Sequence, residues 1–495
     1  MDLNRFPPAV LSTILSHLIE GEEFRPRRIK IGGRLQDIRA ARLVCRQWNA
    51  LAIPHLFETV TLTHQEKNSD DDDSDDDSDD DSDDNFVAWN GLLDNETIRL
   101  SARRVVIKSS PEDVYDCGRG WFDWNSGEAY PSFTDAISRI ADLPNVEALA
   151  IHFHRNAVGV LNRGESWVEP EHSQTRIKTL KAVFNAILQR SAKNPGCASI
   201  RSLAFKNLQN MPIPEFTDSE LYRDVVKDMD RLHLLVAEEF NEHGPDHDIY
   251  CVERQEYEPH LQNTLLPPLA NQLTNLTLAF CEGWGIMPGY FDGKGLIFPH
   301  LKTLTLGNYM MGYHDHFDWV LAQKTLTTLR LDRCHIVSHI RICDELTRWN
   351  VRTDDWEQQP HGSYGFVGEN DRVFTFSGTW ATIFNRIRTE LPNLTDFRVD
   401  QDDYELRFMA WWGLGARLSG RRYMTFDVGL LPSQWVDAAE DGEMEVGDSI
   451  ATPWIKGEND EERDDPDASV NRAREMEEED GAALEALLET VRERC

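Results

Sequence analysis

The sequence predicts an α/β protein in which a helical N-terminal segment precedes a long, irregular series of short parallel strands. Two patterns predict it. Apolar residues recur at helical spacing near the N-terminus, and an apolar-x-x-apolar-x-apolar pattern then returns from Phe57 to Val399. With 40% hydrophobic residues, 14 Trp and 22 Phe in 495 residues, most of the chain has the composition to bury a core.

The charge of the chain is concentrated in two stretches. The 51 basic and 86 acidic residues give a net charge of −35, which argues against a nucleic-acid binder that works through its overall field. Asp70–Asp84 holds twelve Asp and no basic residue, and the segment Val436–Cys495 has a net charge of −15. The rest of the chain carries only −8, so we expect an ordinary, mildly acidic surface for the body.

The eight cysteines and the hydropathy pattern indicate the environment of the chain. No two cysteines form a C-x-x-C pair, and Met1–Leu18 contains Pro7-Pro8 instead of the uninterrupted apolar core of a secretory leader. No window approaches the roughly 18 apolar residues of a membrane helix. We therefore expect reduced thiols, no membrane association, and a cytoplasmic or nuclear location, or both.

The N-terminal segment, residues 1–56, is predicted to contain two amphipathic helices. The first follows Pro7-Pro8, and a loop Ile19–Gln36 separates it from a second helix that ends at Pro54. The apolar face of the second helix carries Ile38, Ala41, Val44, Cys45, Trp48 and Leu51. Two helices of this length cannot bury both apolar faces on each other, so we expect a third partner, either the following domain or another protein.

The residues of these helices carry a family resemblance. F-P-P-A-V-L-S-T-I-L-S-H-L, followed by I-R-A-A-R-L-V-C-R-Q-W-N-A-L-A-I-P-H-L-F, resembles the F-box, with R-L-V-C-R-x-W and P-x-L-F as its most specific parts. The resemblance implies a small helical unit that docks onto the adaptor of Skp–cullin–F-box ubiquitin ligases. The residues that it places at or beneath the adaptor surface are Pro7, Leu11, Ile14, Leu15, Leu18, Leu43, Val44 and Trp48. The basic loop between the helices is longer than the usual connection of that family.

The body, residues 57–435, is predicted from the recurring apolar triplet, whose last two positions alternate as in a strand with one buried face. The triplets are Phe57/Val60/Leu62, Val146/Leu149/Ile151, Ile200/Leu203/Phe205, Leu273/Leu276/Leu278, Leu301/Leu304/Leu306, Leu326/Leu329/Leu331 and Leu394/Phe397/Val399. Leu276 and Leu304 are 28 residues apart, and Leu304 and Leu329 are 25 apart.

Those spacings resemble leucine-rich repeats, whose period is 20–29 residues. The unit Leu326-x-x-Leu329-x-Leu331-x-x-Cys334-x-Ile336 matches the repeat signature except at its last residue. Intervals of 73 residues from Leu203 to Leu276 and 68 from Leu329 to Phe397 make the array irregular, with helical segments such as Thr179–Arg190 and Leu221–Phe240. The resemblance implies a solenoid with a concave parallel sheet whose exposed residues bind a protein partner.

The sequence contains few candidates for chemistry. Cys334, His335, His339 and Cys343 form C-H-x-x-x-H-x-x-x-C, but Cys334 already serves the repeat signature, so we expect no zinc site. The run Tyr313–Asp318 offers two His and two Asp, which a polar helix start with capping acids explains. No G-x-S-x-G, P-loop, G-x-G-x-x-G or H-E-x-x-H motif occurs. We expect no catalytic residue, metal or cofactor.

The two acidic stretches are predicted to be disordered. The insert, residues 68–85, is too charged to fold, and it is either a solvated spacer or a phosphorylation-tuned patch for a basic partner. Ser69, Ser74 and Ser78 each have Asp at +3, which acidophilic kinases favour. In the tail, residues 436–495, only Ala482–Arg494 has a helical apolar stripe, and it could dock on the last repeat or on a partner.

Together these patterns lead to a functional hypothesis. We expect a non-catalytic substrate receptor of a Skp–cullin–F-box ubiquitin ligase, which binds the Skp-type adaptor, and through it a cullin, by its N-terminal helices. The repeat body would hold an unidentified target protein. The alternative is a non-ligase acidic scaffold, or chaperone-like binder, of basic proteins.

Overall fold

The apolar triplets form short parallel strands with helices between them in the computed structural model of the chain, so the predicted α/β class is confirmed. The structure describes residues 7–11, 13, 15, 32–64, 86–110, 131–154, 157–158, 171–237, 252–286, 289–342, 352–363, 369–400, 418, 422–427, 430–433 and 472–495.

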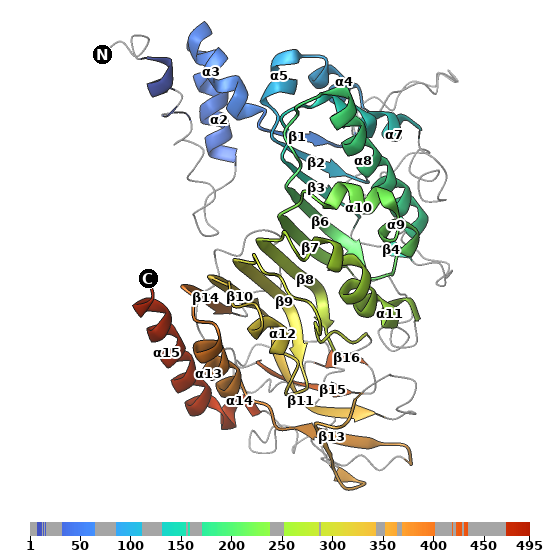
Figure 1. Cartoon of the computed structure of the whole chain (residues 1–495), viewed down its shortest axis with the longest axis vertical. Helices are drawn as coiled ribbons and strands as arrows, with labels where there is room; N and C mark the ends of the chain where they lie inside the picture. The colour runs from blue at the N-terminus through green and yellow to red at the C-terminus, as the bar shows by residue number, and fades with distance from the viewer. Residues whose placement is uncertain are drawn as a thin grey trace, which may run out of the picture. The chain divides into compact units, whose positions relative to one another are not determined.

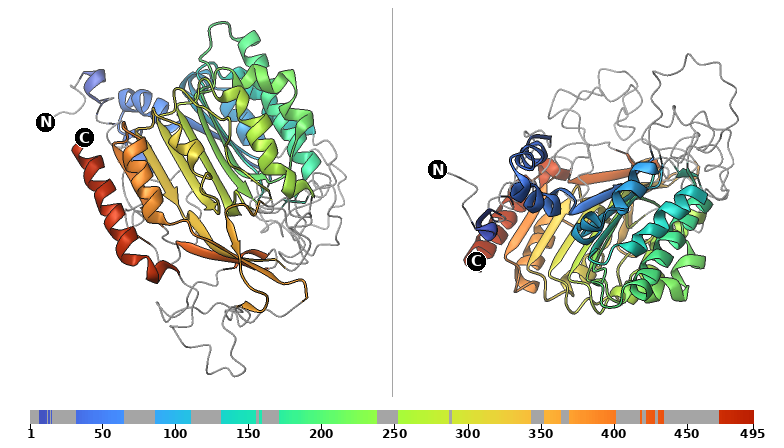
Figure 2. Two further views of the ribbon diagram at one scale, coloured as in Figure 1. Left: turned by 60° about the horizontal axis from the view of Figure 1, so that its bottom comes forward. Right: turned by 90° about the horizontal axis from the view of Figure 1, so that it is seen from above.

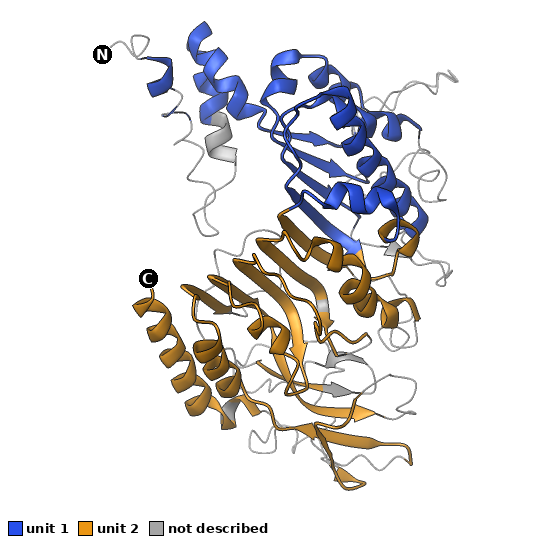
Figure 3. Ribbon diagram, in the orientation of Figure 1, with its two compact units in different colours: residues 1–157, 166–208, 218–229 blue, residues 158–165, 209–217, 230–495 orange. Residues whose placement is uncertain are grey.

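The chain divides into two units (Figure 3). The first unit comprises residues 1–157, 166–208 and 218–229, and the second comprises residues 158–165, 209–217 and 230–495. Elements of the first unit are α2 (Gly32–Ala41), α3 (Arg46–Leu56), β1 (Thr59–Leu62), α4 (Val87–Leu93), α5 (Glu96–Ser101), β2 (Arg104–Lys108), α7 (Pro131–Ser138), η3 (Arg139–Asp142), β3 (Ala148–His152), β5 (Glu171–His172), α8 (Ser173–Lys193), β6 (Ser202–Gln209) and α10 (Glu220–Val226). The short strand β4 (Ala157–Val158) contains one of the points where the chain passes to the second unit.

In the first unit, β1, β2, β3 and β6 have their apolar positions in register. Val60 lies opposite Val105, which lies opposite Leu149, which lies opposite Leu203. These residues and their partners two positions later are buried, because one face of every strand packs toward the helices. Figure 1 shows α8 and α10 alongside the strands of this unit, and Phe184 of α8 stacks on Tyr222 of α10.

The helix α8 is fixed to the start of β3 by a buried arginine. Arg190 donates hydrogen bonds to the carbonyl oxygens of Leu143, Pro144 and Val146, at 2.5, 2.8 and 2.8 Å. These bonds satisfy three carbonyls of the segment that leads into β3, so a long-range contact sets where that strand begins.

In the second unit the elements are α9 (Pro214–Thr217), β7 (Arg231–Ala237), α11 (Val252–His260), η5 (Leu261–Leu265), η6 (Pro267–Leu269), β8 (Asn275–Trp284), β9 (Thr303–Met311), α12 (Asp318–Leu321), β10 (Thr328–Asp332), β11 (His335–Ile342), β12 (Trp356–Gln358), β13 (Arg372–Phe376), α13 (Trp380–Glu390), β14 (Asp396–Asp400), β15 (Tyr423–Asp427), β16 (Leu430–Ser433), α14 (Arg472–Glu475) and α15 (Glu477–Glu493). The parallel series β7, β8, β9, β10 and β14 keeps one register: Leu232, Leu276, Leu304, Leu329 and Phe397 lie side by side.

The sheet of the second unit branches at β9. The first part of β9 pairs with β10, whereas Met310 and Met311 at its end pair with His335 and Ile336 of β11. Beyond that point β11 pairs with β15 in parallel and with β13 antiparallel, and β12 and β16 complete this branch. The sequence pattern did not predict the branch, because its strands lack the triplet.

Two strands that carry the apolar triplet were also missed in the prediction. Ala102-x-x-Val105-x-Ile107 precedes and includes β2, and Met229-x-x-Leu232-x-Leu234 precedes and includes β7. The predicted helix Leu221–Phe240 is therefore wrong in its second half, because α10 ends at Val226 and the chain becomes the strand β7. The interval of 73 residues from Leu203 to Leu276 divides into 29 and 44 at Leu232.

A residue with left-handed backbone conformation recurs at one position of three repeats, within β6 and β9 and directly after β10. The only non-glycine residues with positive φ in the described part of the chain are Asn207, Asn308 and Arg333, at 59°, 56° and 50°. Each lies four residues after the middle apolar position of its triplet. The Asn308 amide donates to the carbonyl oxygens of Phe280 and Cys281, at 2.7 and 3.1 Å, which joins the ends of β9 and β8.

The end of the chain is helical and packs on the body. In Figure 2, α15 lies alongside α13, and Leu484, Leu487 and Val491 of the predicted stripe are buried. The helix α15 begins at Glu477, earlier than the predicted start at Ala482. Residues 434–471 of the tail lie outside the described residues.

Candidate functional site

The N-terminal helices form a small apolar cluster of their own. Its fully buried members are Leu11, Leu15 and Ala52, and the buried side chains of Ile38 and Trp48 pack with them. Ala41, Cys45, Leu51 and Leu56 are half-buried against the cluster. The amide of Leu11 donates to the carbonyl of Pro7, which starts the first helical turn behind the proline pair.

The predicted second helix is two helices. The first, α2, includes Gly32–Gln36, which the sequence pattern assigned to a loop, and it ends at Ala41. The amides of Leu43 and Val44 bond to Ala40 and Ala41 in a tight turn, and Cys45 is extended, with φ −165° and ψ 173°. Pro54 lies inside α3 and does not end it, so the prediction of one helix stopped by Pro54 is wrong.

The turn between α2 and α3 exposes two large apolar side chains. Leu43 is 80% exposed and Val44 is 60% exposed, whereas Trp48, one helical turn further along, is 8% exposed. Val10 and Pro7 are also exposed, on the first helix. The structure therefore divides the predicted adaptor residues into a buried set, Leu11, Leu15 and Trp48, and an exposed set, Pro7, Leu43 and Val44. Ile14 and Leu18 lie outside the described residues.

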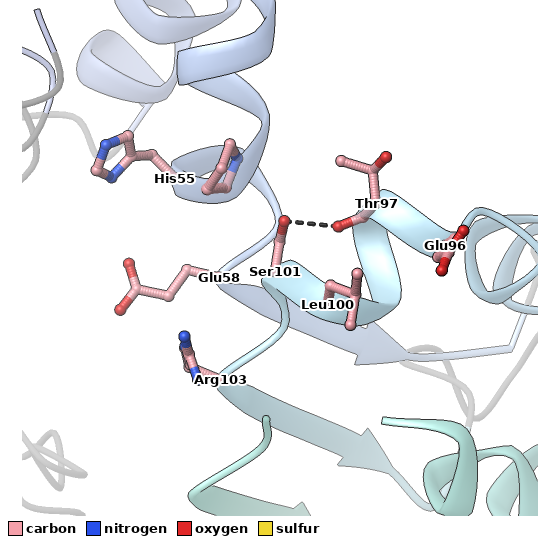
Figure 4. A pocket seen from close by; sticks show the side chains of 8 residues that line it. His55, Glu58, Glu96, Thr97, Leu100, Ser101 and Arg103 are labelled. Carbon is pink, nitrogen blue, oxygen red and sulfur yellow. Dashed lines mark hydrogen bonds between the residues drawn. The ribbon is translucent and has the colours of Figure 1, made fainter. Parts of the chain in front are cut away.

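A hollow of about 560 Å³ lies beside the end of α3, between it and α5. Its lining residues are Pro54, His55, Glu58, Glu96, Thr97, Leu100, Ser101 and Arg103 (Figure 4). The Ser101 hydroxyl donates to the carbonyl of Thr97 at 2.6 Å. In Figure 4 the side chains of His55 and Glu58 extend away from Ser101. The hollow therefore does not bring an acid, a base and a nucleophile together.

The geometry around Cys334 is that of a packing residue. Its thiol is buried and donates to the carbonyl oxygen of Leu306 at 3.5 Å, and burial raises its pKa. His339 follows on β11, where its Nδ1 lies 2.9 Å from the Ser338 hydroxyl. Within the described ranges no group of three or more His, Cys, Asp and Glu is placed to hold a metal ion; Cys343 lies outside those ranges.

The run Tyr313–Asp318 leads into a helix start at Asp318 of α12, as predicted, but no side chain caps this helix by a hydrogen bond, and the two acids of the run pair with arginines. Asp315 bonds to Arg352 at 3.0 Å, and Asp318 bonds to Arg386 at 2.8 Å. His316 is fully buried, where its Nδ1 accepts from the Gly312 amide and burial lowers its pKa to about 3. These residues join β9, α12 and α13, and their arrangement is structural.

We expected exposed strand residues on the sheet face opposite the helices. In the second unit, residues in the middle of this face are buried. Thr277 and Thr305, in the middle of β8 and β9, are 5% and 1% exposed. In the first unit, the same face carries exposed Thr59, Thr61 and Arg104. It also carries Lys108 and Lys206. The sequence pattern did not single them out, because β2 was not predicted and the triplet marks only the apolar residues of β6.

No protein-family model matches the chain, and no curated protein matches it either. Across the described ranges no helix has the length and apolar character needed to cross a membrane. Ser69, Ser74 and Ser78, the predicted phosphorylation sites, lie outside those ranges.

Proposed function

We propose that the chain is an F-box-type substrate receptor with a leucine-rich-repeat-like body. In this proposal the N-terminal helices bind the Skp-type adaptor of a ubiquitin ligase, and the body binds a target protein. The chemistry belongs to other subunits, and this chain contributes proximity between the target and the activated ubiquitin.

The observation that carries the adaptor part is the pair of exposed apolar side chains beside a buried cluster. Leu43 and Val44 are 80% and 60% exposed, although α2 and α3 fold around Trp48. Two adjacent large apolar residues on a folded turn cost solvation free energy unless a partner covers them. Their positions fall in the R-L-V-C-R-x-W run that resembles the F-box most closely.

The repeat part of the proposal is supported by the strand register and by the recurring left-handed residue. The same triplet positions lie side by side from strand to strand in each unit. The Asn207 side chain donates to the Phe153 carbonyl at 3.0 Å, and the Asn308 side chain donates to the Phe280 carbonyl. The same asparagine hydrogen bond therefore joins two different pairs of successive repeats. Such nearest-neighbour contacts are typical of solenoid repeats.

The test is binding of a purified Skp-type adaptor to the full chain and to Leu43→Asp/Val44→Asp. A charge placed in an apolar contact loses its hydration without a partner, so we expect at least a tenfold loss of affinity. The thermal unfolding of the variant should match wild type, because both side chains are exposed.

The matched control is Val252→Asp/Ile297→Asp, which makes the same kind of change at residues 49% and 63% exposed in the second unit. It should bind the adaptor normally. No adaptor binding by wild type, or equal losses in both variants, would overturn the proposal and favour the acidic scaffold that binds basic proteins.

A further inference from the structure

The turn between α2 and α3 carries basic side chains beside its two exposed apolar ones. Arg39 lies one helical turn before Leu43, and Arg42 directly precedes Leu43. Arg46 follows Val44 by two residues and begins α3. All three arginines are exposed, and within the described ranges their guanidinium groups form no ion pair or hydrogen bond. These charges are therefore available to a partner that covers the apolar pair.

The arginines and the apolar pair face away from the buried cluster of the N-terminal helices. Ile38, Cys45 and Trp48 pack toward that cluster, so the exposed residues between these positions lie on the outer side. The amides of Leu43 and Val44 both donate to carbonyl oxygens of α2, which fixes the turn. The outer surface thus has an apolar centre with arginines around it.

The sign of this charge is opposite to that of the chain as a whole. Residues 25–56 contain eight Lys and Arg residues and one acid, Asp37, whereas the complete sequence has a net charge of −35. An acidic partner is therefore repelled by most of the chain and attracted to this segment. Complementary charge around an interface raises the association rate and fixes the orientation in which the two proteins dock.

We propose that the turn surface, formed by Arg39, Arg42, Leu43, Val44 and Arg46, docks onto an acidic protein surface in which carboxylates surround an apolar depression. The apolar pair loses its contact with water in that depression, and the guanidinium groups attract the carboxylates at its rim. A nucleic-acid backbone offers phosphates but no apolar depression for Leu43 and Val44, so the combination favours a protein partner.

The Skp-type adaptor as the occupant of the turn surface rests on the proposed function. The arginines add a second property to the apolar contact, because they set how fast the adaptor docks and how strongly salt slows docking. Charges at the rim of an interface act mainly on the association rate, whereas most other interface contacts act on dissociation. The two contributions can therefore be measured separately.

The experiment measures the association and dissociation rates of the full-length protein with a purified Skp-type adaptor at two salt concentrations. Between about 0.01 M and about 0.15 M salt the Debye length falls from roughly 30 to roughly 8 Å, so wild-type association should slow by about tenfold. At the lower salt, Arg39→Gln/Arg42→Gln/Arg46→Gln should associate about tenfold more slowly than wild type, with dissociation within about twofold of wild type. Salt should have little further effect on this variant.

The matched control is Arg223→Gln/Arg372→Gln/Arg492→Gln. It removes three exposed arginines from α10, β13 and α15 and gives the same net charge as the test variant. It should associate as wild type does at both salt concentrations, because the position of the charge matters and not its total.

A second variant, Arg39→Lys/Arg42→Lys/Arg46→Lys, keeps the three charges and should keep the wild-type rate and salt dependence. Thermal unfolding of the glutamine and lysine variants should match wild type, because the three side chains are exposed. This comparison distinguishes a lost charge from a disturbed turn.

Adaptor binding that depends on Leu43 and Val44 but not on the arginines would overturn the acidic-rim proposal and leave the proposed function intact. Equal slowing in the glutamine variant and its control, or a lysine variant as slow as the glutamine variant, would do the same. If wild type fails to bind the adaptor at either salt concentration, both proposals are wrong. Arginine-dependent binding of phosphatidylserine vesicles would in that case identify a membrane as the partner.

Discussion

The helices at the two ends of the chain differ in whether their apolar side chains are covered by other residues. The N-terminal helices bury Leu11, Leu15 and Trp48 but leave Leu43 and Val44 in solvent. The C-terminal helix α15 buries its apolar stripe on α13 and adds a closed polar network around Asp480. Apolar side chains left exposed at one end, and covered at the other, indicate an interface in the first case and a structural cap in the second.

The two ends also differ in whether their buried polar groups have hydrogen-bond partners. Asp480 is fully buried and accepts from Arg422 Nε at 2.8 Å, from the Ala381 amide at 2.7 Å and from the Tyr423 hydroxyl. Among the described residues, the buried Trp48 indole N–H has no acceptor at all. A cap optimised for stability satisfies its buried polar groups, whereas the N-terminal cluster does not.

The largest effect should come from the C-terminal cap. Asp480→Ala removes the buried carboxylate that pairs with Arg422, while the ion pair of Arg422 with the exposed Glu477 at 3.2 Å remains. Breaking a buried ion pair costs about 3–5 kcal/mol, so we expect a loss at the low end of that range. Denaturant unfolding of the second unit should show that loss. Glu485→Ala, an exposed acid on the same helix, should change stability by under about 0.5 kcal/mol, and equal effects would mean that the network does not hold the cap.

A smaller effect on stability, confined to the N-terminal helices, should follow from a substitution at Trp48. Trp48→Ala removes the largest side chain of a small cluster, which costs about 3 kcal/mol in larger cores. We expect faster proteolysis within residues 32–56, while amide exchange in β2, β3 and β6 stays as in wild type. Arg46→Ala, exposed on the same helix, is the control. Loss of protection throughout the sheet would make this end a structural cap as well.

The smallest effect concerns acid sensitivity next to the N-terminal helices. His64 follows β1 and packs between Phe86 and Phe133, with ring centroids 5.1 and 5.5 Å away. Burial lowers its pKa to about 4. The unfolded chain takes up a proton near pH 6.5 and the folded chain does not, so this contribution is complete above pH 6.5 and is lost as the pH falls toward 4.

From pH 7 to pH 5 the loss from His64 should reach about 2 kcal/mol in the free energy of unfolding of the first unit. His64→Phe keeps the aromatic packing and should lose less stability than wild type over that range. His300→Gln, which removes an exposed imidazole from the second unit, is the control. Parallel pH profiles for wild type and His64→Phe would contradict the prediction.

Much of the strand framework could be predicted because the triplet is a local signal that each strand repeats. The two missed strands carry it too, but Ala102 is a weak apolar marker and the run Leu234–Val236 also suits a helix. The break after α2 could not be predicted, because Val44 and Cys45 continue the helical periodicity. It depends on how Cys45 and Trp48 pack against the first helix.

Within the candidate sites, the sequence predicted a set of adaptor residues but not which of them are exposed. That division depends on the turn at Leu43 and Val44. That Lys108, His152 and Lys206 lie opposite one another could not be found without the register of β2, β3 and β6, since these residues are far apart in sequence. The pairing of Arg422 with Asp480 likewise joins segments 58 residues apart.

The contact between His64 and Phe86 has a consequence for how this chain tolerates change in length. The described chain stops at His64 and resumes at Phe86, and their rings are 5.1 Å apart at the centroids, so both ends of the acidic run start from one fixed point. Doubling the length of a flexible loop costs only about 0.6 kcal/mol. We therefore expect the chain between His64 and Phe86 to accept added or removed aspartates, or an engineered reporter domain, with little penalty to the sheet.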